Sequence, residues 1–209
     1  MSTIEFKIAK LCTLFILDKK ERRIKRNLLK IKLTTWKYGK QVMKTAKSVG
    51  AGFFCGGYSY VTRNTEIAND VSFTGNFRVE GYGRCKIGQH LHAGRDCLVI
   101  TSNHNYLKGK TIPYDEINIC KDVIIEDFVW LGARVLILPG AKIGEGAIIQ
   151  GGSVVHGEIP PYAIAGGNPA KVFKYRDIEH FQKLKSQKKF YTNEVKFTNL
   201  VDKDIRNEK

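Results

Sequence analysis

Residues 123–155 read VIIEDFVWLGARVLILPGAKIGEGAIIQGGSVV. Large aliphatic residues recur in this stretch at every sixth position, namely Ile125, Leu131, Ile137, Ile143, Ile149 and Val155. The residue four positions after each of the first five is small or β-branched: Val129, Val135, Ala141, Ala147 and Ser153. A helix would require spacings of three and four, and a half-buried strand would alternate. The period of six therefore argues against both as the repeating unit.

The six-residue frame extends toward the amino terminus. It runs through Val61, Ile67, Phe73 and Val79 and then, shifted by two residues, through Ile87, Ala93 and Val99. One large aliphatic and one small residue in every six describe a chain that coils as a triangular prism, in which each unit forms one short strand and one corner. The aliphatic side chains then stack in columns inside the prism, and the small residue fits near a crowded corner. The sequence therefore predicts an all-β solenoid, a parallel β-helix.

One long segment interrupts the repeat. Residues 101–121 are largely polar and contain the run Ser-Asn-His-Asn at positions 102–105. An excursion of this length, which leaves a regular solenoid and returns to it, is more often functional than idle. We therefore expect this loop excursion to carry part of a functional site.

The chain of 209 residues, 43% of them hydrophobic, suits one domain with appended terminal segments. We expect a basic, helical segment over residues 1–50, the β-helix over residues 51–174, and a short helix and tail over residues 175–209. In the last segment Ile178, Phe181 and Leu184 recur at nearly helical spacing.

The formal net charge of +15 is concentrated near the amino terminus, because residues 1–47 contain 14 Lys and Arg against three acidic residues. Apolar residues at helical spacing accompany this charge: Leu14, Leu17, Ile24, Leu28 and Ile31. Such a segment fits either an anionic membrane surface or a helical cap that covers a neighbouring apolar surface and leaves its lysines in solvent. Nucleic acid is disfavoured, because the basic stretch has little aromatic interleaving and no recognised binding signature.

The apolar runs and the cysteines both indicate the cellular compartment in which the chain is expected. The longest apolar run, residues 11–17, is far shorter than the roughly 20 residues of a spanning helix, and no signal-peptide cleavage site follows it. The five cysteines form no Cys-x-x-Cys pair, which argues against a disulfide framework and against a thiolate zinc site. We therefore expect a cytoplasmic chain, with a peripheral contact at the inner face of the cell membrane through residues 1–47 as an option.

Residues 123–155, followed by IPPYAIAGGNPAK at 159–171, resemble the hexapeptide-repeat acetyltransferases. The fuller pattern is similar to the branch that acetylates sugars, which includes galactoside and maltose acetyltransferases and O-acetyltransferases of capsule and lipopolysaccharide synthesis. The resemblance covers about residues 55–178. It implies a left-handed β-helix, a homotrimer with active sites between neighbouring prisms, a carbohydrate acceptor, and acetyl-CoA as donor without a metal.

The resemblance assigns the catalytic base to His104, in its Ser-Asn-His-Asn setting. A sugar hydroxyl needs a base as it attacks a thioester, and a histidine can accept that proton and pass it to the leaving thiolate. Asp115, Glu116 and Glu80 are the carboxylates that could polarise His104, and the sequence does not choose among them. The expected reaction is O-acetylation of a cell-surface polysaccharide or its precursor. N-acetylation of an amino sugar or an antibiotic is the alternative, because an amine acceptor needs the same base.

The resemblance also implies binding residues. Asn76 matches an asparagine that contacts the acceptor in galactoside enzymes, although the chain from Asn76 to Ile87 is two residues shorter here; a plain corner asparagine is the alternative. Trp130 matches the family's tryptophan beside the pantetheine arm. The remaining implied coenzyme positions are small residues lining a narrow groove and lysines near the phosphates, namely Ala133, Gly151, Gly152, Lys171 and Lys174. His156 and Gly157 depart from the Thr-Lys of many relatives, so contacts to the nucleotide are expected to differ there.

Two other functions fit the prism less well. Carbonic anhydrases of one class share it but bind zinc through three histidines, and the one candidate set, His90, His92 and His104, lacks that spacing. A scaffold that stacks prisms end to end would need bare ends and no excursion, whereas segments here precede the first coil and follow the last.

Overall fold

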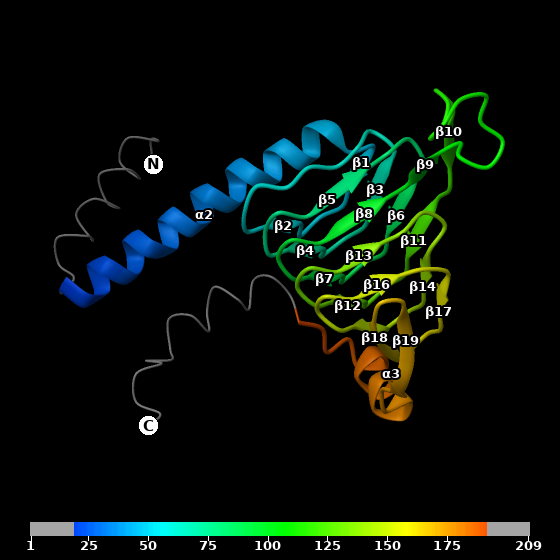
Figure 1. The fold of residues 1–209 in the computed structure, drawn as a ribbon. Coiled ribbons are helices and arrows are strands. Elements are labelled where there is room, and N and C mark those ends of the chain that lie inside the picture. Colours follow the sequence, from blue (N-terminus) through cyan, green and yellow to red (C-terminus); the bar gives the residue numbers. More distant parts are fainter. Residues whose placement is uncertain (1–18, 192–209) are drawn as a thin grey trace.

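The computed structural model describes residues 19–191, and within its first helix only part of the side chains. The first element of the described part is α2 (Lys19–Thr45), a stack of short strands follows it, and the last element is α3 (Ile178–Ser186). In Figure 1 the two helices lie at opposite ends of the stack. The predicted basic helix and carboxy-terminal helix are thus confirmed where the chain is described, while Leu14, Leu17 and the tail beyond residue 191 lie outside the described residues.

Three sheets form the sides of the prism, and we call them the first, second and third face in the order in which each turn passes through them. The first face comprises β1 (Ser48–Val49), β3 (Thr65–Ile67), β6 (Cys85–Ile87), β11 (Val123–Ile125), β14 (Lys142–Ile143) and β17 (Glu158–Ile159). The second face comprises β2 (Phe54–Cys55), β4 (Ser72–Phe73), β7 (His92–Ala93), β12 (Trp130–Leu131), β15 (Ile148–Ile149), β18 (Ala163–Gly167) and β19 (Ala170–Tyr175). The third face comprises β5 (Arg78–Glu80), β8 (Leu98–Ile100), β13 (Leu136–Ile137) and β16 (Val154–Val155).

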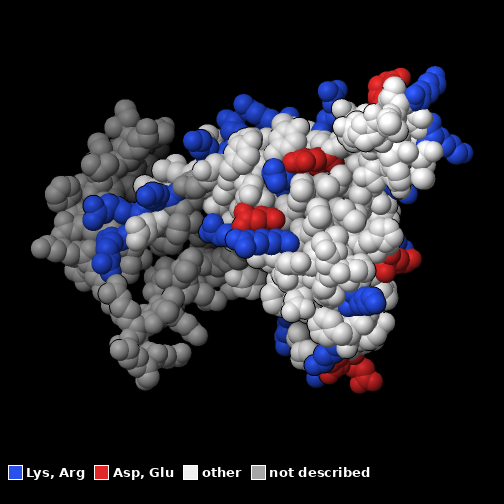
Figure 2. Space-filling view, viewed as in Figure 1, with Lys and Arg blue, Asp and Glu red and all other residues white. Residues whose placement is uncertain are grey.

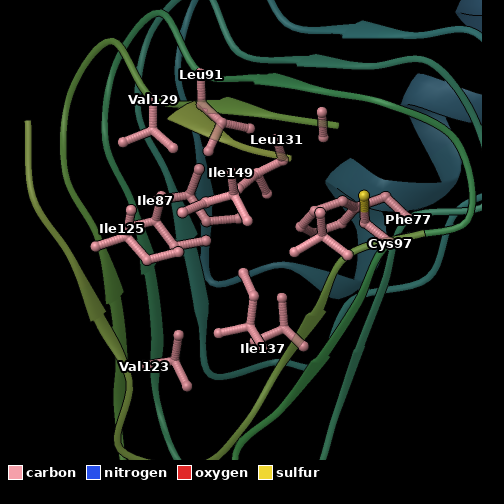
Figure 3. Packing of buried hydrophobic residues seen from close by; sticks show 14 of the residues in the cluster. Phe77, Ile87, Leu91, Cys97, Val123, Ile125, Val129, Leu131, Ile137 and Ile149 are labelled. Carbon is pink, nitrogen blue, oxygen red and sulfur yellow. The ribbon is translucent and has the colours of Figure 1, made fainter. Parts of the chain in front are cut away.

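The strand register places the sixth-position aliphatics in columns. On the first face, parallel pairing aligns one residue from each strand in turn: Ile67, Ile87, Ile125, Ile143 and Ile159. The third face aligns Val79, Val99, Ile137 and Val155 in the same way. All of these side chains are buried, and Figure 3 shows labelled members pointing into the space that the turns enclose. The parallel β-helix predicted from the six-residue period is confirmed.

Each corner of the prism requires a sharp change of backbone direction. At the corner between the second and third faces, the second corner, left-handed backbone recurs on successive turns at Asn76, Asp96, Arg134 and Gly152, with φ of 50°, 62°, 59° and 75°. A side chain in this conformation costs free energy, which glycine avoids and which asparagine and aspartate tolerate best. The stacking of identical corners therefore fixes which residues point outward at the edge of the prism.

Residues 101–121 leave the prism at the corner between the third and first faces, the third corner. They form an antiparallel hairpin of β9 (Ser102–His104) and β10 (Asn118–Cys120), which projects from the stack in Figure 1. We call this segment the arm. Where it returns, the Arg84 backbone N–H and Nε donate to the Asp122 carboxylate at 2.9 and 2.8 Å. The predicted loop excursion is therefore anchored at its base.

The end of α2 covers the beginning of the prism. Val42 is fully buried, and Tyr38 and Ala46 pack against the same core. The interpretation of the basic segment as a cap therefore holds for the carboxy-terminal end of α2. In the described part of the chain, no helix combines the length and the apolar character needed to cross a membrane.

Cysteines in the described residues are all free. Cys55, Cys85 and Cys97 are buried, and Cys120 on β10 is exposed. Cys12 lies outside the described residues.

Candidate active site

His104 is the last residue of β9, at the base of the arm, and its side chain is exposed. Its imidazole ring lies flat against the Tyr114 ring, with ring centroids 3.8 Å apart and an interplanar angle of 6°. The backbone is held as well, because the Tyr106 N–H donates to the His104 carbonyl at 3.0 Å. The imidazole is thus fixed in orientation while its edge faces solvent.

Asp115 holds the arm together from inside. It is buried, and its carboxylate accepts hydrogen bonds from the Ile117 N–H, the Asn105 side-chain amide and the Lys110 N–H at 3.0, 3.0 and 3.2 Å. Burial raises the pKa of the Asp115 carboxyl, but the hydrogen bonds from these three donors outweigh burial, and the pKa is lowered overall. Asp115 is therefore an anionic clamp that fixes the loop carrying Tyr114.

The sequence offered three carboxylates as possible partners of His104, and in the structure each of them has different surroundings. Glu116 is exposed next to Asp115, and Glu80 pairs with Arg78 at 3.3 Å. Across residues 19–191, no hydrogen bond or ion pair joins His104 to Asp115, Glu116 or Glu80.

The second corner brings together three of the predicted coenzyme positions. The Gly152 N–H donates to the Ala133 carbonyl at 2.8 Å, and a Cβ on Gly151 would lie 3.0 Å from the same oxygen. A Cβ on Gly152 would meet no atom within 4 Å, so this edge of the prism is open. Asn76 lies at the same corner, two turns before Ala133 and three turns before Gly152, where its Nδ2 donates to Asp96 Oδ1 at 2.8 Å. The corner therefore offers backbone that a narrow ligand can approach closely.

Trp130 projects outward from the second face and is 54% exposed. It stands between His92 of β7 and Ile148 of β15 in the strand register. A shallow groove runs past it, lined also by His90, His92, Phe128, Val129, Arg176 and Tyr191. The indole is thus free to form one wall for a bound molecule.

Lys171 and Lys174 lie on β19, the last strand of the second face, and both are exposed. The turn that precedes them contains the cis peptide bond between Asn168 and Pro169. Three strand spacings separate β19 from β12, a distance of roughly 14 Å. The two lysines therefore place positive charge at the far end of the face that carries Trp130.

His104 and Trp130 lie on opposite sides of one prism. The arm leaves at the third corner, which is the corner opposite the second face in a three-sided turn. The buried columns of side chains fill the space between them. One chain therefore does not bring the imidazole to the tryptophan.

The other histidines have different surroundings. His90 stacks on Phe128 and lies against Phe190, with centroids 4.8 and 4.7 Å apart, while His156 and His180 are exposed. His90 and His92 are on the second-face side, away from His104 at the third corner. Among the residues described, no three His, Cys, Asp or Glu side chains form a group that could hold a metal ion.

Sequence reasoning missed three features. Tyr114 lies ten residues from His104, and nothing in the spacing marks it as a stacking partner. Gly83 approaches the base of the arm so closely that a Cβ there would lie 2.5 Å from the Thr101 carbonyl. A hollow of about 200 Å³ lies between the second face and α3, lined with aromatic and basic side chains. The two-residue shift of frame before Ile87 is a signal that could have marked the chain around Gly83 as irregular.

The fold is a triangular parallel β-helix of six-residue units with an arm that carries a histidine. This places the protein in the class of hexapeptide-repeat β-helices. Residues 122–157 match the family model described as bacterial transferase hexapeptide, six repeats. The resemblance to hexapeptide-repeat acetyltransferases predicted from the sequence is thereby confirmed.

Two named acetyltransferases are similar in sequence to this chain. A chloramphenicol acetyltransferase of Klebsiella aerogenes is 47% identical over 55 residues, which are 26% of each chain. WbbJ of Escherichia coli K12, provisionally named a lipopolysaccharide biosynthesis O-acetyl transferase, is 33% identical over 117 residues, 50% of this chain and 60% of that protein. The chain thus spans from about a quarter to 60% of the length of these relatives.

Solved structures share the fold. A galactoside acetyltransferase in complex with coenzyme A superposes with a TM-score of 0.58 and 19% identity, over 75% of this chain and 84% of the other.

Proposed function

We propose that this protein transfers an acetyl group from acetyl-CoA to a sugar hydroxyl, with His104 as the general base. The observation that carries the proposal is the exposed imidazole of His104, held flat on Tyr114 at the base of a clamped arm. His104 accepts the proton of the hydroxyl as its oxygen attacks the acetyl carbon. The carbon–sulfur bond then breaks, and His104 returns the proton to the coenzyme thiolate.

The second corner and second face are proposed to hold the donor. The edge at Ala133, Gly151 and Gly152 suits a thin pantetheine chain, because a Cβ on Gly152 would meet no atom within 4 Å. Trp130 supplies an apolar wall, and Lys171 and Lys174 supply charge for the phosphates, without the bidentate contacts that arginines would give. Asn76, with an amide that can both donate and accept, is proposed to contact the acceptor.

The active form is proposed to be a homotrimer. The support is the separation of His104 from Trp130 on opposite sides of one prism, which leaves each half of the site incomplete. A complementation experiment tests this assembly. His104→Ala and Ala133→Trp each inactivate, and trimers formed from a mixture of the two variants regain activity, because some sites combine an intact arm with an intact corner. If both halves belong to the same chain, mixing restores nothing.

The acceptor is proposed to be a cell-surface polysaccharide, such as capsule or lipopolysaccharide, or its precursor, and the similarity to WbbJ supports this class. The protein would act in the cytoplasm, with a peripheral contact at the inner face of the membrane through residues 1–47. The test is thiol release from acetyl-CoA with matched pairs of acceptors, a sugar and its amino-sugar analogue, and with chloramphenicol. Acetyl groups that mild base removes from a sugar product support the proposal. Acetyl transfer confined to amines or to the antibiotic would replace it with the alternative acceptor class.

A further inference from the structure

We propose that a surface of α2, formed by Leu29, Leu33, Trp36 and Met43 and called here the α2 stripe, docks on an anionic lipid surface. This inference deepens the membrane contact in the proposed function by naming the docking surface and its partner.

The α2 stripe is exposed although its side chains are large and apolar. Leu29 and Leu33 are each 58% exposed, Trp36 is 64% exposed and Met43 is 53% exposed. Their spacing of four, three and seven residues places them on one side of the helix. Tyr38 and Val42, which pack on the prism, lie on another side. The helix therefore has a second apolar row that the prism does not cover.

A row of cations runs beside the α2 stripe. Arg26, Lys30, Lys37 and Lys44 are exposed, and their spacing of four, seven and seven residues places them on one side of the helix, next to the stripe. Lys40 lies within the stripe, with Nζ 4.8 Å from the Trp36 ring centroid. Figure 2 shows basic side chains along the visible side of α2. The whole helix carries eleven Lys and Arg against one Glu.

This arrangement selects a lipid surface over other partners. Leucine and methionine gain little from contact with nucleic acid, whereas an interface of headgroups and acyl chains accepts both the apolar row and the flanking cations. Tryptophan is favoured at such an interface because its ring is apolar and its N–H is polar. A second copy of α2 would bring one row of cations against another, which repels. Figure 1 shows α2 extending away from the prism, and the four side chains of the stripe are all more than half exposed.

The first test is flotation of the full chain with vesicles of phosphatidylcholine alone or mixed with phosphatidylglycerol. The cation variant Arg26→Gln/Lys37→Gln/Lys44→Gln is compared with a control of equal charge loss elsewhere, Arg63→Gln/Lys86→Gln/Lys183→Gln. Each cation at the surface contributes roughly a fivefold factor, so the cation variant is expected to bind anionic vesicles roughly a hundredfold more weakly, and the control nearly as wild type. Equal loss in both variants, or equal binding to neutral and anionic vesicles, would overturn the proposal.

The second test examines the apolar row. In a Trp130→Phe background Trp36 is the single tryptophan, and its emission is expected to shift to shorter wavelength with anionic vesicles. The variant Leu33→Gln/Trp36→Gln/Met43→Gln keeps every charge and is expected to lose vesicle binding by on the order of tenfold or more. Unchanged emission, or a change of oligomeric state in this variant with vesicle binding intact, would contradict lipid docking. Neither readout depends on acetyl transfer, so failure of the enzymatic proposal would show separately as absent thiol release with vesicle binding retained.

Discussion

The rings of His104 and Tyr114 lie parallel, with centroids 3.8 Å apart and 6° between their planes. The two residues come from opposite ends of the arm's loop, so this contact joins the fold of the loop to the orientation of the imidazole. An imidazolium that forms when His104 accepts a proton would also face the ring of Tyr114, which attracts a cation.

Tyr114→Leu should therefore lower kcat/KM for acetyl transfer by roughly two- to tenfold, because this factor corresponds to the free energy that an aromatic pair contributes. The KM for acetyl-CoA should be unchanged. Tyr114→Phe keeps the ring and should retain most activity. Proton NMR of the His104 ring provides a second measurement, because the leucine variant should lose the upfield ring-current shift and the phenylalanine variant should keep it. Equal losses in both variants would show that the hydroxyl matters rather than the stack.

Asp115→Asn should loosen the arm, because an amide nitrogen would face the donors of Asn105, Lys110 or Ile117. Hydrogen exchange at Lys110 and Ile117 should accelerate, activity should fall, and the melting temperature should change little. Glu116→Gln, at an exposed neighbouring position, is the matched control. Faster exchange throughout the prism would instead make Asp115 a determinant of global stability.

The same carboxylate predicts a pH dependence. Because its hydrogen bonds lower the pKa of Asp115 despite burial, its contribution to arm order is complete above the ordinary pKa of an aspartic acid. That contribution is lost as the pH falls through the lowered pKa. The protection factors at Lys110 and Ile117, which correct for the slower intrinsic exchange of amides at low pH, should fall at acidic pH in the wild type, and this fall should be absent in Asp115→Asn.

Gly83→Ala should lower the free energy of unfolding by about 1–3 kcal/mol, the usual result of overpacking, because its Cβ would lie 2.5 Å from the Thr101 carbonyl. Gly39→Ala in α2 is the control, because its nearest contact would be an ordinary 3.9 Å to Phe53. That substitution should raise stability by about 0.5–1 kcal/mol through helix propensity. Denaturant unfolding measures both, and a stabilising Gly83→Ala would contradict the close approach.

Cys85 should resist alkylation in the folded protein. Burial raises the pKa of its thiol to about 12, so at pH 8 roughly one part in ten thousand is thiolate. Iodoacetamide at pH 8 followed by peptide mass spectrometry should show Cys120 modified and Cys85 unmodified until denaturant is added. Comparable labelling of both would mean that the prism opens readily.

The regular part of this fold was predictable because its repeat is local and strict. Each sixth aliphatic from Ile125 to Val155 is buried in the column that the period assigns to it. The arm was predictable as an interruption, but the stacking of Tyr114 and the clamp of Asp115 depend on hydrogen bonds within an irregular loop, which no period encodes. The placement of His104 and Trp130 on opposite sides of the prism could not be predicted without knowing at which corner the arm leaves and on which face Trp130 lies.

Helix α2 shows a different limit. Ile24, Leu28 and Ile31 predict one apolar row, which continues along the helix to Tyr38 and the buried Val42. The second row, from Leu29 to Met43, emerges only when the structure shows which side of the helix the prism covers. Tyr38 and Val42 pack on the prism and Leu29, Leu33, Trp36 and Met43 do not, and the spacing of the sequence alone does not tell which side of the helix the prism covers.

The most direct measurement of the central claim is kcat/KM for acetyl transfer in His104→Ala beside His180→Ala, a control at an exposed histidine of α3. The account predicts a loss of roughly two to four powers of ten in His104→Ala, with acetyl-CoA binding and oligomeric state retained, and near-normal activity in His180→Ala. Near-normal turnover in His104→Ala would contradict it.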